Sequence, residues 1–175
     1  MCDKKDNPFL LKNIEVSVER ILKAITEQED ILVFGHCDCD GIASTAILYD
    51  FLTQLGGRVW YYVLNRNTES YGLSEIAVNN FLKMGSPNLV ITVDCGTTDI
   101  RSVKKLKERG IDTIITDHHE CGNEISDAVA IINPKVHDDY SSRELAGVGV
   151  VLKLIIALCK KKKLEEECYL RYIDI

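Results

Sequence analysis

Three residues whose side chains can bind a metal ion follow directly after the apolar run ILVFG, residues 31–35. They are His36, Asp38 and Asp40, at every second position. If the run is a strand and the extended backbone continues through them, alternate side chains share one face, so an imidazole and two carboxylates converge. Taken singly, each residue type is more often a satisfied histidine, a turn residue or a helix cap. The spacing of all three together predicts a metal site.

Two further polar clusters follow later apolar runs. Asp94 comes after NLVITV, and Asp117, His118 and His119 come after DTIIT. In an open parallel sheet, ligands bind at the carboxyl ends of the strands. The ends of three neighbouring strands would span about two inter-strand spacings, roughly 10 Å, which is room for two ions about 3.5 to 4 Å apart, as in two-metal phosphoesterases. We therefore expect one site built from three strand ends.

The types of ligand indicate which metal the site takes. Imidazole with several carboxylates suits a hard or borderline divalent ion, so we expect two Mn²⁺ ions, with Mg²⁺ as the alternative. A zinc or redox site is a second possibility, because four cysteines lie near these clusters. In an extended segment two of them point away from the carboxylate face, so we favour packed thiols. The four are Cys37, Cys39, Cys95 and Cys121.

Gly41 lets the backbone turn tightly from the first strand into a helix. We expect Ser44 or Thr45 to cap that helix and to direct its amide groups at an anion, for which phosphate is the natural candidate.

Apolar runs alternate with amphipathic stretches from residue 31 onward, a pattern typical of an α/β fold. We expect a three-layer α/β/α arrangement around an open, mainly parallel five-stranded sheet of order 2-1-3-4-5. Glycines that follow the periodic runs indicate helix C-caps at Gly56, Gly57, Gly85 and Gly110. The expected strands are 31–35, 58–64, 88–94, 112–117 and 129–134, and the expected helices are 45–56, 74–85, 99–110 and one from about Glu144.

Residues 12–29 are expected to form an amphipathic helix that packs across the sheet. Its predicted apolar side consists of Ile14, Val16, Val18, Ile21, Leu22 and Ile25. The chain then divides into a helical extension, residues 1–30, and one domain, residues 31–175.

Size and composition limit the function classes. The 175 residues are 46% hydrophobic, enough for one ordinary core, and the net charge of −6 gives no overall electrostatic footprint for nucleic acid. Any nucleic-acid contact must therefore be local. The run Lys160 to Lys163 is expected to be a solvated helix end rather than a phosphate contact. Seven cysteines, a polar N-terminus and no span-length apolar segment favour the cytoplasm and no membrane.

Three motifs, in order, resemble those of the DHH phosphoesterase superfamily. They are HxDxDG (36–41), VDCGTT (93–98) and TDHHE (116–120). Further stretches resemble the RecJ-like single-strand exonucleases within it, namely NRNTESYGLS (65–74), INPK (132–135) and LAGVGVVLK (145–153). The resemblance covers residues 31 to 175, and small-oligonucleotide phosphoesterases (nanoRNases) are the nearest rivals.

The resemblance implies a role for each site residue. His36, Asp38 and Asp94 would hold one ion, and Asp40, Asp94 and His118 the other, with Asp94 bridging. His119 would contact the substrate phosphate, and Asp117 would hold an imidazole in its tautomer. Ser44 is expected near that phosphate, Arg66 and Tyr71 would place the strand, and Trp60, Tyr61 or Tyr62 would stack on bases, although at least one of these must lie in the core.

The implied reaction is metal-dependent hydrolysis of a phosphodiester, in the 5′ to 3′ direction on single-stranded DNA. The alternatives are hydrolysis of short oligonucleotides or cyclic dinucleotides, and a non-catalytic scaffold role in a replication or repair assembly. Partners would be single-stranded DNA or short oligonucleotides, and replication or repair proteins.

Two departures from the family pattern matter. His36 stands where RecJ-like proteins usually carry Asp. The fourth motif should follow RYIDI (171–175), which resembles the segment that precedes it, so we expect a domain truncated before that motif and without the C-terminal substrate-binding domain. Asp174 is expected to be an ordinary residue and not a replacement ligand.

Overall fold

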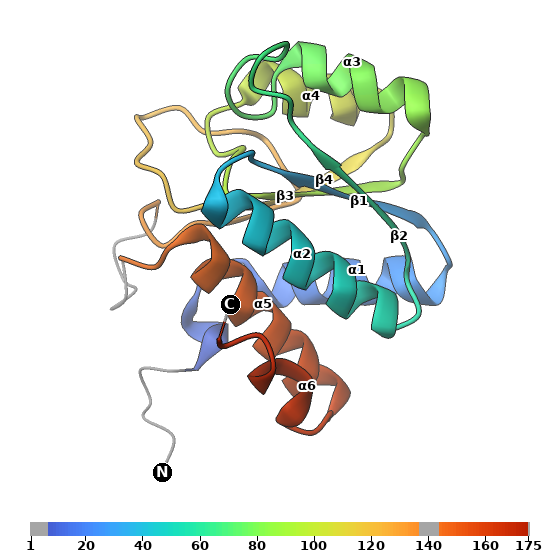
Figure 1. Cartoon of the computed structure of the whole chain (residues 1–175), viewed down its shortest axis with the longest axis vertical. Helices are drawn as coiled ribbons and strands as arrows, with labels where there is room; N and C mark the ends of the chain where they lie inside the picture. Colours follow the sequence, from blue (N-terminus) through green and yellow to red (C-terminus); the bar gives the residue numbers. More distant parts are fainter. Residues whose placement is uncertain (1–6, 137–143, 175) are drawn as a thin grey trace.

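A computed structural model describes residues 7–136 and 144–174. Residues 1–6 of the predicted extension and Ile175 of RYIDI lie outside that part. Five parallel strands form one sheet, and its order, β2-β1-β3-β4-β5, confirms the prediction (Figure 1). The strands are β1 (Asp30–Gly35), β2 (Arg58–Val63), β3 (Leu89–Val93), β4 (Asp112–Thr116) and β5 (Ala130–Ile132).

Helices cover both faces of the sheet, as Figure 1 shows. The helices α3 and α4 lie on one face, and α1, α2 and α5 lie on the other. Strand β1 explains this, because Ile31 and Val33 point into one core and Leu32 and Phe34 into the other. The helices are α1 (Ile14–Thr26), α2 (Cys39–Gln54), α3 (Glu75–Met84), α4 (Ile100–Glu108), α5 (Gly147–Lys162) and α6 (Glu167–Leu170), after a 3-10 turn η2 (Pro8–Leu10).

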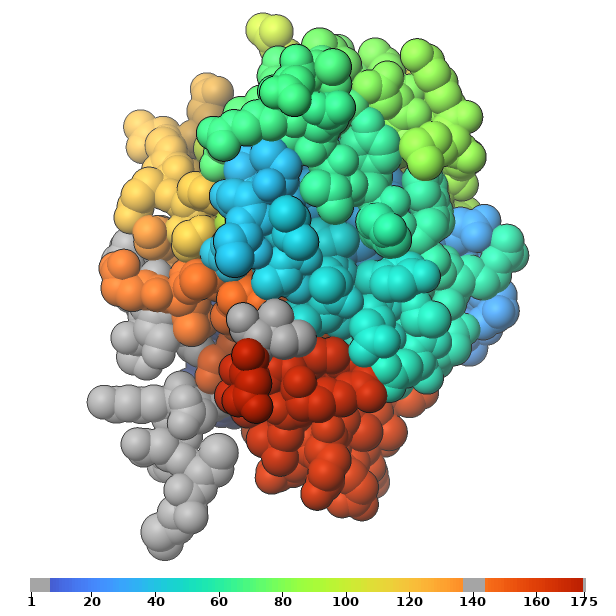
Figure 2. Space-filling model, viewed as in Figure 1, coloured from blue at the N-terminus to red at the C-terminus, as the bar shows by residue number. Residues whose placement is uncertain are grey.

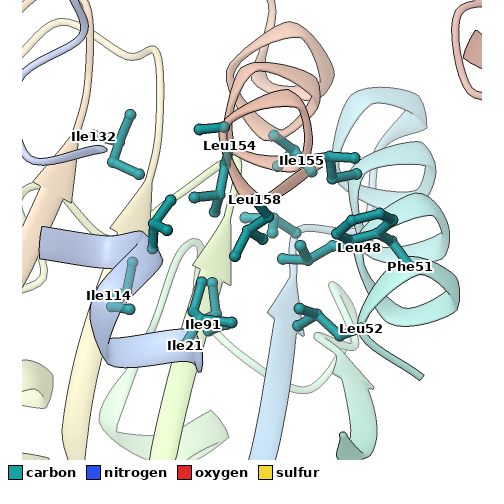
Figure 3. Packing of buried hydrophobic residues seen from close by; sticks show 14 of the residues in the cluster. Ile21, Leu48, Phe51, Leu52, Ile91, Ile114, Ile132, Leu154, Ile155 and Leu158 are labelled. Carbon is teal, nitrogen blue, oxygen red and sulfur yellow. The ribbon is translucent and has the colours of Figure 1, made fainter. Parts of the chain in front are cut away.

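The larger core joins α1, α2 and α5 to the sheet (Figure 3). In α1, Ile14, Val18 and Ile21 are fully buried, which agrees with the predicted apolar side. Val16 is an error in that prediction, since it is 46% exposed. At 100° per residue, position 16 lies on the opposite side of the helix from position 14.

The start of α2 differs from the prediction. Extended backbone ends at Asp38, whose Oδ1 accepts the amide of Gly41 at 2.9 Å, so the helix begins at Cys39. Ser44 and Thr45 therefore lie in the second turn and do not cap the helix. The hydroxyl of Thr45 donates to the carbonyl of Gly41 instead, at 2.7 Å.

The C-terminal helix α5 begins at Gly147, three residues later than Glu144. Its last turn is basic and exposed, and Lys161 lies 3.8 and 3.5 Å from the carboxylates of Glu15 and Glu19 on α1. This agrees with a solvated helix end. None of the helices within residues 7–136 and 144–174 combines the length and the apolar composition that a membrane span requires.

The helices end at or just before the predicted glycines. Gly85 is the C-cap of α3, with an extended φ of −174°, whereas Gly56 and Gly110 directly follow the C-caps Leu55 and Arg109 with left-handed φ values of +86° and +73°. Asp174 is exposed beyond α6.

The outer side of α2 is exposed on the face shown in Figure 2, where it lies above α6.

Candidate metal and phosphate site

The register of the sheet brings the three polar clusters together. Gly35 of β1 pairs with Val93 of β3, and Val93 pairs with Thr116 of β4. His36, Asp94 and Asp117 each come directly after one of these residues. Neighbouring parallel strands lie about 4.8 Å apart, so side chains from three strand ends meet at one edge of the sheet.

A first group consists of His36, Asp38 and Asp94, which offer ligand atoms that all lie within 4.8 Å of one another. His36 is 1% exposed, and its Nδ1 lies 2.9 Å from Asp38 Oδ2 and 3.8 Å from Asp94 Oδ2. Neither ring nitrogen has a hydrogen bond of acceptable geometry. A buried imidazole without hydrogen-bond partners is costly, and a cation bound among these three residues would satisfy it.

Asp94 is shared with a second group, formed with His118 and His119. It is 1% exposed, and its Oδ1 lies 3.1 Å from His118 Nε2 but has no hydrogen-bond partner. Burial, followed by the nearby charges of Asp38 and Asp40, raises the pKa of Asp94 to about 8. Its φ of +61° is left-handed, an uncommon conformation that recurs at functional sites.

Asp40 lies beside the second group, and its carboxylate already accepts hydrogen bonds from backbone amides. In the first turn of α2, its Oδ2 accepts the amide of Gly147 and its Oδ1 the amide of Val148, both at 2.7 Å. It therefore caps α5 while lying 3.6 Å from His118 Nε2. The expectation that Asp40 extends a strand face with His36 and Asp38 is wrong, because the helix has begun by Cys39.

Asp117 is buried and collects four hydrogen bonds. Its Oδ2 accepts the amide of Thr97 at 3.1 Å, while its Oδ1 accepts the amides of His118 and His119 at 2.7 and 3.1 Å and lies 2.7 Å from His119 Nδ1. Burial alone would raise the pKa of Asp117, but the hydrogen bonds from His119 and Thr97 outweigh it and hold the pKa below its usual value. The bond to Asp117 in turn raises the pKa of His119.

The predicted substrate-binding residues Tyr71, Arg66 and Ser44 differ in their exposure and in their contacts with the site. Tyr71 contacts both groups of potential metal ligands, since its ring centroid lies 4.4 Å from that of His36 and its hydroxyl lies 3.4 Å from His119 Nε2. Arg66 is exposed on the same loop. Ser44 is fully buried, with an Oγ that has no hydrogen-bond partner, so its hydroxyl is not presented at the surface.

The aromatic residues of β2 are partly buried. Trp60 and Tyr62 pack against the smaller core, and Tyr61 is 56% exposed and meets Tyr49 edge-on at 5.3 Å. None of the three reaches full burial, because β2 is an edge strand.

Sequence reasoning missed two residues that hold the site together. Asn133 donates to the carbonyl of His119 at 3.0 Å and to the hydroxyl of Thr97 at 3.1 Å. A Cβ on Gly147 would lie 2.7 Å from Asp94 Oδ1, so the α5 backbone needs glycine there. Asn133 and Gly147 lie in the INPK and LAGVGVVLK stretches, whose sequence alone predicts no role for either residue. Within the part of the chain that the structure describes, no cysteine joins either group.

The residues present fit a divalent cation. Two groups of imidazole and carboxylate share Asp94, and buried atoms of His36 and Asp94 have no hydrogen-bond partner. The sequence profile of the "DHH family, N-terminal domain" matches residues 30–174. The chain belongs to the DHH family.

Within the DHH family, the chain is similar to RecJ proteins. The single-stranded-DNA-specific exonuclease RecJ of Bacillus subtilis is 42% identical over 153 residues, which are 87% of this chain and 19% of that protein. A crystal structure of exonuclease RecJ bound to manganese gives a TM-score of 0.81 at 31% identity, over 89% of this chain and 39% of that one. RecJ of Thermus thermophilus in complex with Mn²⁺ gives 0.79 at 29% identity, over 94% and 23%. The chain spans about a fifth of the B. subtilis protein.

Proposed function

We propose that this chain is the catalytic core of a divalent-metal-dependent phosphodiesterase that degrades single-stranded DNA from the 5′ end. One observation carries the proposal: the buried carboxylate of Asp94 belongs to two groups of potential metal ligands at once. A shared carboxylate is the arrangement that two-metal phosphoryl chemistry needs. Two similar solved structures, at 31% and 29% identity, are of RecJ with manganese, which supports Mn²⁺ as the ion.

We assign His36 and Asp38 to one ion and His118 and Asp40 to the other, with Asp94 between them. Asp40, 3.6 Å from His118, takes the place of His119 of the second group, because the Nδ1 of His119 already contacts Asp117. Bound divalent ions would polarise a phosphate oxygen and lower the pKa of an attacking water. Asp40 contacts the amides of α5 at the same time as it faces His118, so the helix start holds its carboxylate in place. Gly147 lies against Asp94 and limits where that carboxylate can turn.

His119 is assigned to the scissile phosphate. The carboxylate of Asp117 lies against Nδ1, which places the ring proton there and leaves Nε2 directed at Tyr71 and the cluster. Because Asp117 also raises the pKa of His119, the imidazole is more often cationic and better suited to an anionic phosphate. Tyr71 and Arg66 would then place the strand.

Single-stranded DNA as the substrate rests on the relatives. The similar B. subtilis protein is a single-stranded-DNA-specific exonuclease. The match includes 87% of this chain but only 19% of that protein. We propose the same substrate class for this chain, and replication or repair proteins as its partners.

Hydrolysis assays test the proposal. Wild type and Asp94→Asn are compared in Mn²⁺ on a single strand labelled at the 5′ end, the same strand labelled at the 3′ end, a dinucleotide and pApA. We expect early release of a labelled mononucleotide only from the 5′-labelled strand, and a rate at least about 100-fold lower in the variant. Faster hydrolysis of the dinucleotide or pApA would favour the short-oligonucleotide alternative. Equal rates for the two proteins would exclude Asp94-dependent catalysis.

A further inference from the structure

The loop between β2 and α3, residues 64–74, carries both proposed strand-placing residues, Arg66 and Tyr71, yet contains no helix or strand. Tyr71 is 60% exposed, so packing against a core does not fix it. Its ring nevertheless lies 4.4 Å from His36, centroid to centroid. Something other than burial of the ring must hold this part of the loop.

A buried carboxylate within the loop provides one attachment. Glu69 is 6% exposed and accepts hydrogen bonds from the amide of Asn65 at 2.9 Å, from the side-chain amide of Asn80 at 2.6 Å and from the hydroxyl of Tyr62. The amide of Glu69 also donates to the carbonyl of Asn65 at 2.8 Å. An ionised carboxylate is buried at this depth only when hydrogen bonds replace its water. Glu69 thus joins the loop to β2 and α3.

A second carboxylate attaches the other side of the loop. Asp99, just before α4, accepts the amide of Leu73 at 2.7 Å. Gly72 adopts a φ of +71°, and a Cβ there would lie 2.8 Å from Asp99 Oδ2. The close approach of the loop to Asp99 therefore requires glycine.

Tyr71 lies between these two attachments, two residues after Glu69 and two before Leu73. The side-chain hydrogen bonds of Glu69 and Asp99 within the described residues go to the loop, β2 and α3, and not to His36, Asp94 or His119. We propose that Glu69 and Asp99 are positioning residues that hold Tyr71 against His36 and His119 and so set substrate binding. This inference rests on the proposed function for its kinetic part only.

The test uses Glu69→Gln, which keeps the size of the side chain but removes the charge that three donors share. Glu75→Gln is the matched control, since Glu75 is an exposed carboxylate on the adjoining helix α3. Tyr62→Phe is a milder second variant, because it removes one donor while keeping the ring that stacks on Phe34. NMR detects the nuclear Overhauser effect between the rings of Tyr71 and His36.

We expect Glu69→Gln to lose this ring-to-ring signal and Tyr62→Phe to weaken it, while Mn²⁺ affinity stays at the wild-type value. On single-stranded DNA, kcat/KM should fall roughly 10- to 100-fold, mainly through KM. A double-mutant cycle with Tyr71→Ala should be non-additive, because Glu69 acts through Tyr71. Glu75→Gln should match the wild type in all three measurements.

A wild-type ring-to-ring signal in Glu69→Gln, or additive losses in the cycle, overturns the proposal. Loss of Mn²⁺ binding in parallel with activity also overturns it, since that would indicate a general structural role. If the wild-type chain hydrolyses no phosphodiester, the proposed function fails, and the NMR signal alone then supports or overturns the positioning role.

Discussion

The carboxylate of Asp40 caps a helix that begins 107 residues later: its Oδ2 accepts the amide of Gly147 at 2.7 Å. The same oxygen lies 3.6 Å from His118 Nε2. One side chain therefore connects the start of α5 to the cluster at the strand ends, and the position of α5 and the geometry of the site depend on each other.

Replacing Asp40 should destabilise the fold. Asp40→Ala leaves the first amides of α5 without an acceptor, and we expect a loss of about 1 to 2 kcal/mol in the free energy of unfolding, as for other helix caps. Asp40→Asn keeps an acceptor oxygen and should lose less. Urea unfolding without metal measures both. Asp127→Ala removes an exposed carboxylate near Lys107 and should cost under about 1 kcal/mol; equal losses for Asp40→Ala and Asp127→Ala would contradict the capping role.

Gly147→Ala should weaken metal binding as well as stability. Its Cβ would lie 2.7 Å from Asp94 Oδ1 and 3.0 Å from Asp94 Cβ, so the carboxylate or the start of α5 must move. We expect destabilisation of about 1 to 3 kcal/mol and a clear loss of Mn²⁺ affinity, measured by calorimetry.

Gly149→Ala is the matched control two residues further along α5. Its Cβ would meet the end of the Leu145 side chain at 3.2 Å, and alanine favours the helix by up to about 1 kcal/mol. Unchanged Mn²⁺ affinity in both variants would show that Gly147 does not fix Asp94.

The metal-free protein should lose stability as pH rises. The native pKa of Asp94, about 8, lies above its unfolded value of 3.8, so the native state binds the extra proton between these values. The contribution of Asp94 to the free energy of unfolding is therefore fully present below about pH 4. It is lost as pH rises through 8, by at most about 1.4 kcal/mol per pH unit. The raised pKa of His119 acts in the same direction above pH 6.5.

Thermal unfolding in a chelator between pH 5 and 8.5 measures this dependence. Asp94→Asn should flatten it, and saturating Mn²⁺ should stabilise the wild type more at the alkaline end, since the cation binds the ionised cluster. The same slope in wild type and Asp94→Asn would contradict the assignment to Asp94.

Asp117→Asn should change the titration of His119. The carboxylate raises the pKa of His119 through the contact at Nδ1, and an amide cannot stabilise the imidazolium in this way. We expect the pKa of His119 to fall, as followed by the NMR shift of its ring proton. Glu120→Gln changes an exposed carboxylate next to His119 and should leave the titration much closer to wild type. A wild-type His119 titration in Asp117→Asn would rule out this pairing.

The sheet and the meeting of its strand ends could be predicted because each strand is a short apolar run followed at once by polar residues. His36, Asp94 and Asp117 lie where that pattern places them. The position of Asp40 could not be predicted in this way. Polar residues at every second position are compatible with an extended segment, and also with a helix cap followed by the first helical turn. The hydrogen bond from the amide of Gly41 to Asp38 shows that the helix forms here.

The contacts of α5 and of the 64–74 loop depend on the tertiary fold. Gly147 reaches Asp94 and Asp40 from far along the chain, and Glu69 is buried only because β2 and α3 enclose it. No local sequence pattern distinguishes such a glutamate from a solvated one, so its burial is visible only in the structure.

The number of Mn²⁺ ions bound per chain tests the central claim, that Asp94 is shared between two ions, most directly. Equilibrium dialysis against Mn²⁺ at pH 8, with wild type and Asp94→Asn, measures it. The shared carboxylate predicts two ions in the wild type and loss of both in the variant. One ion in the wild type, or two ions whose affinities do not change in Asp94→Asn, would contradict it.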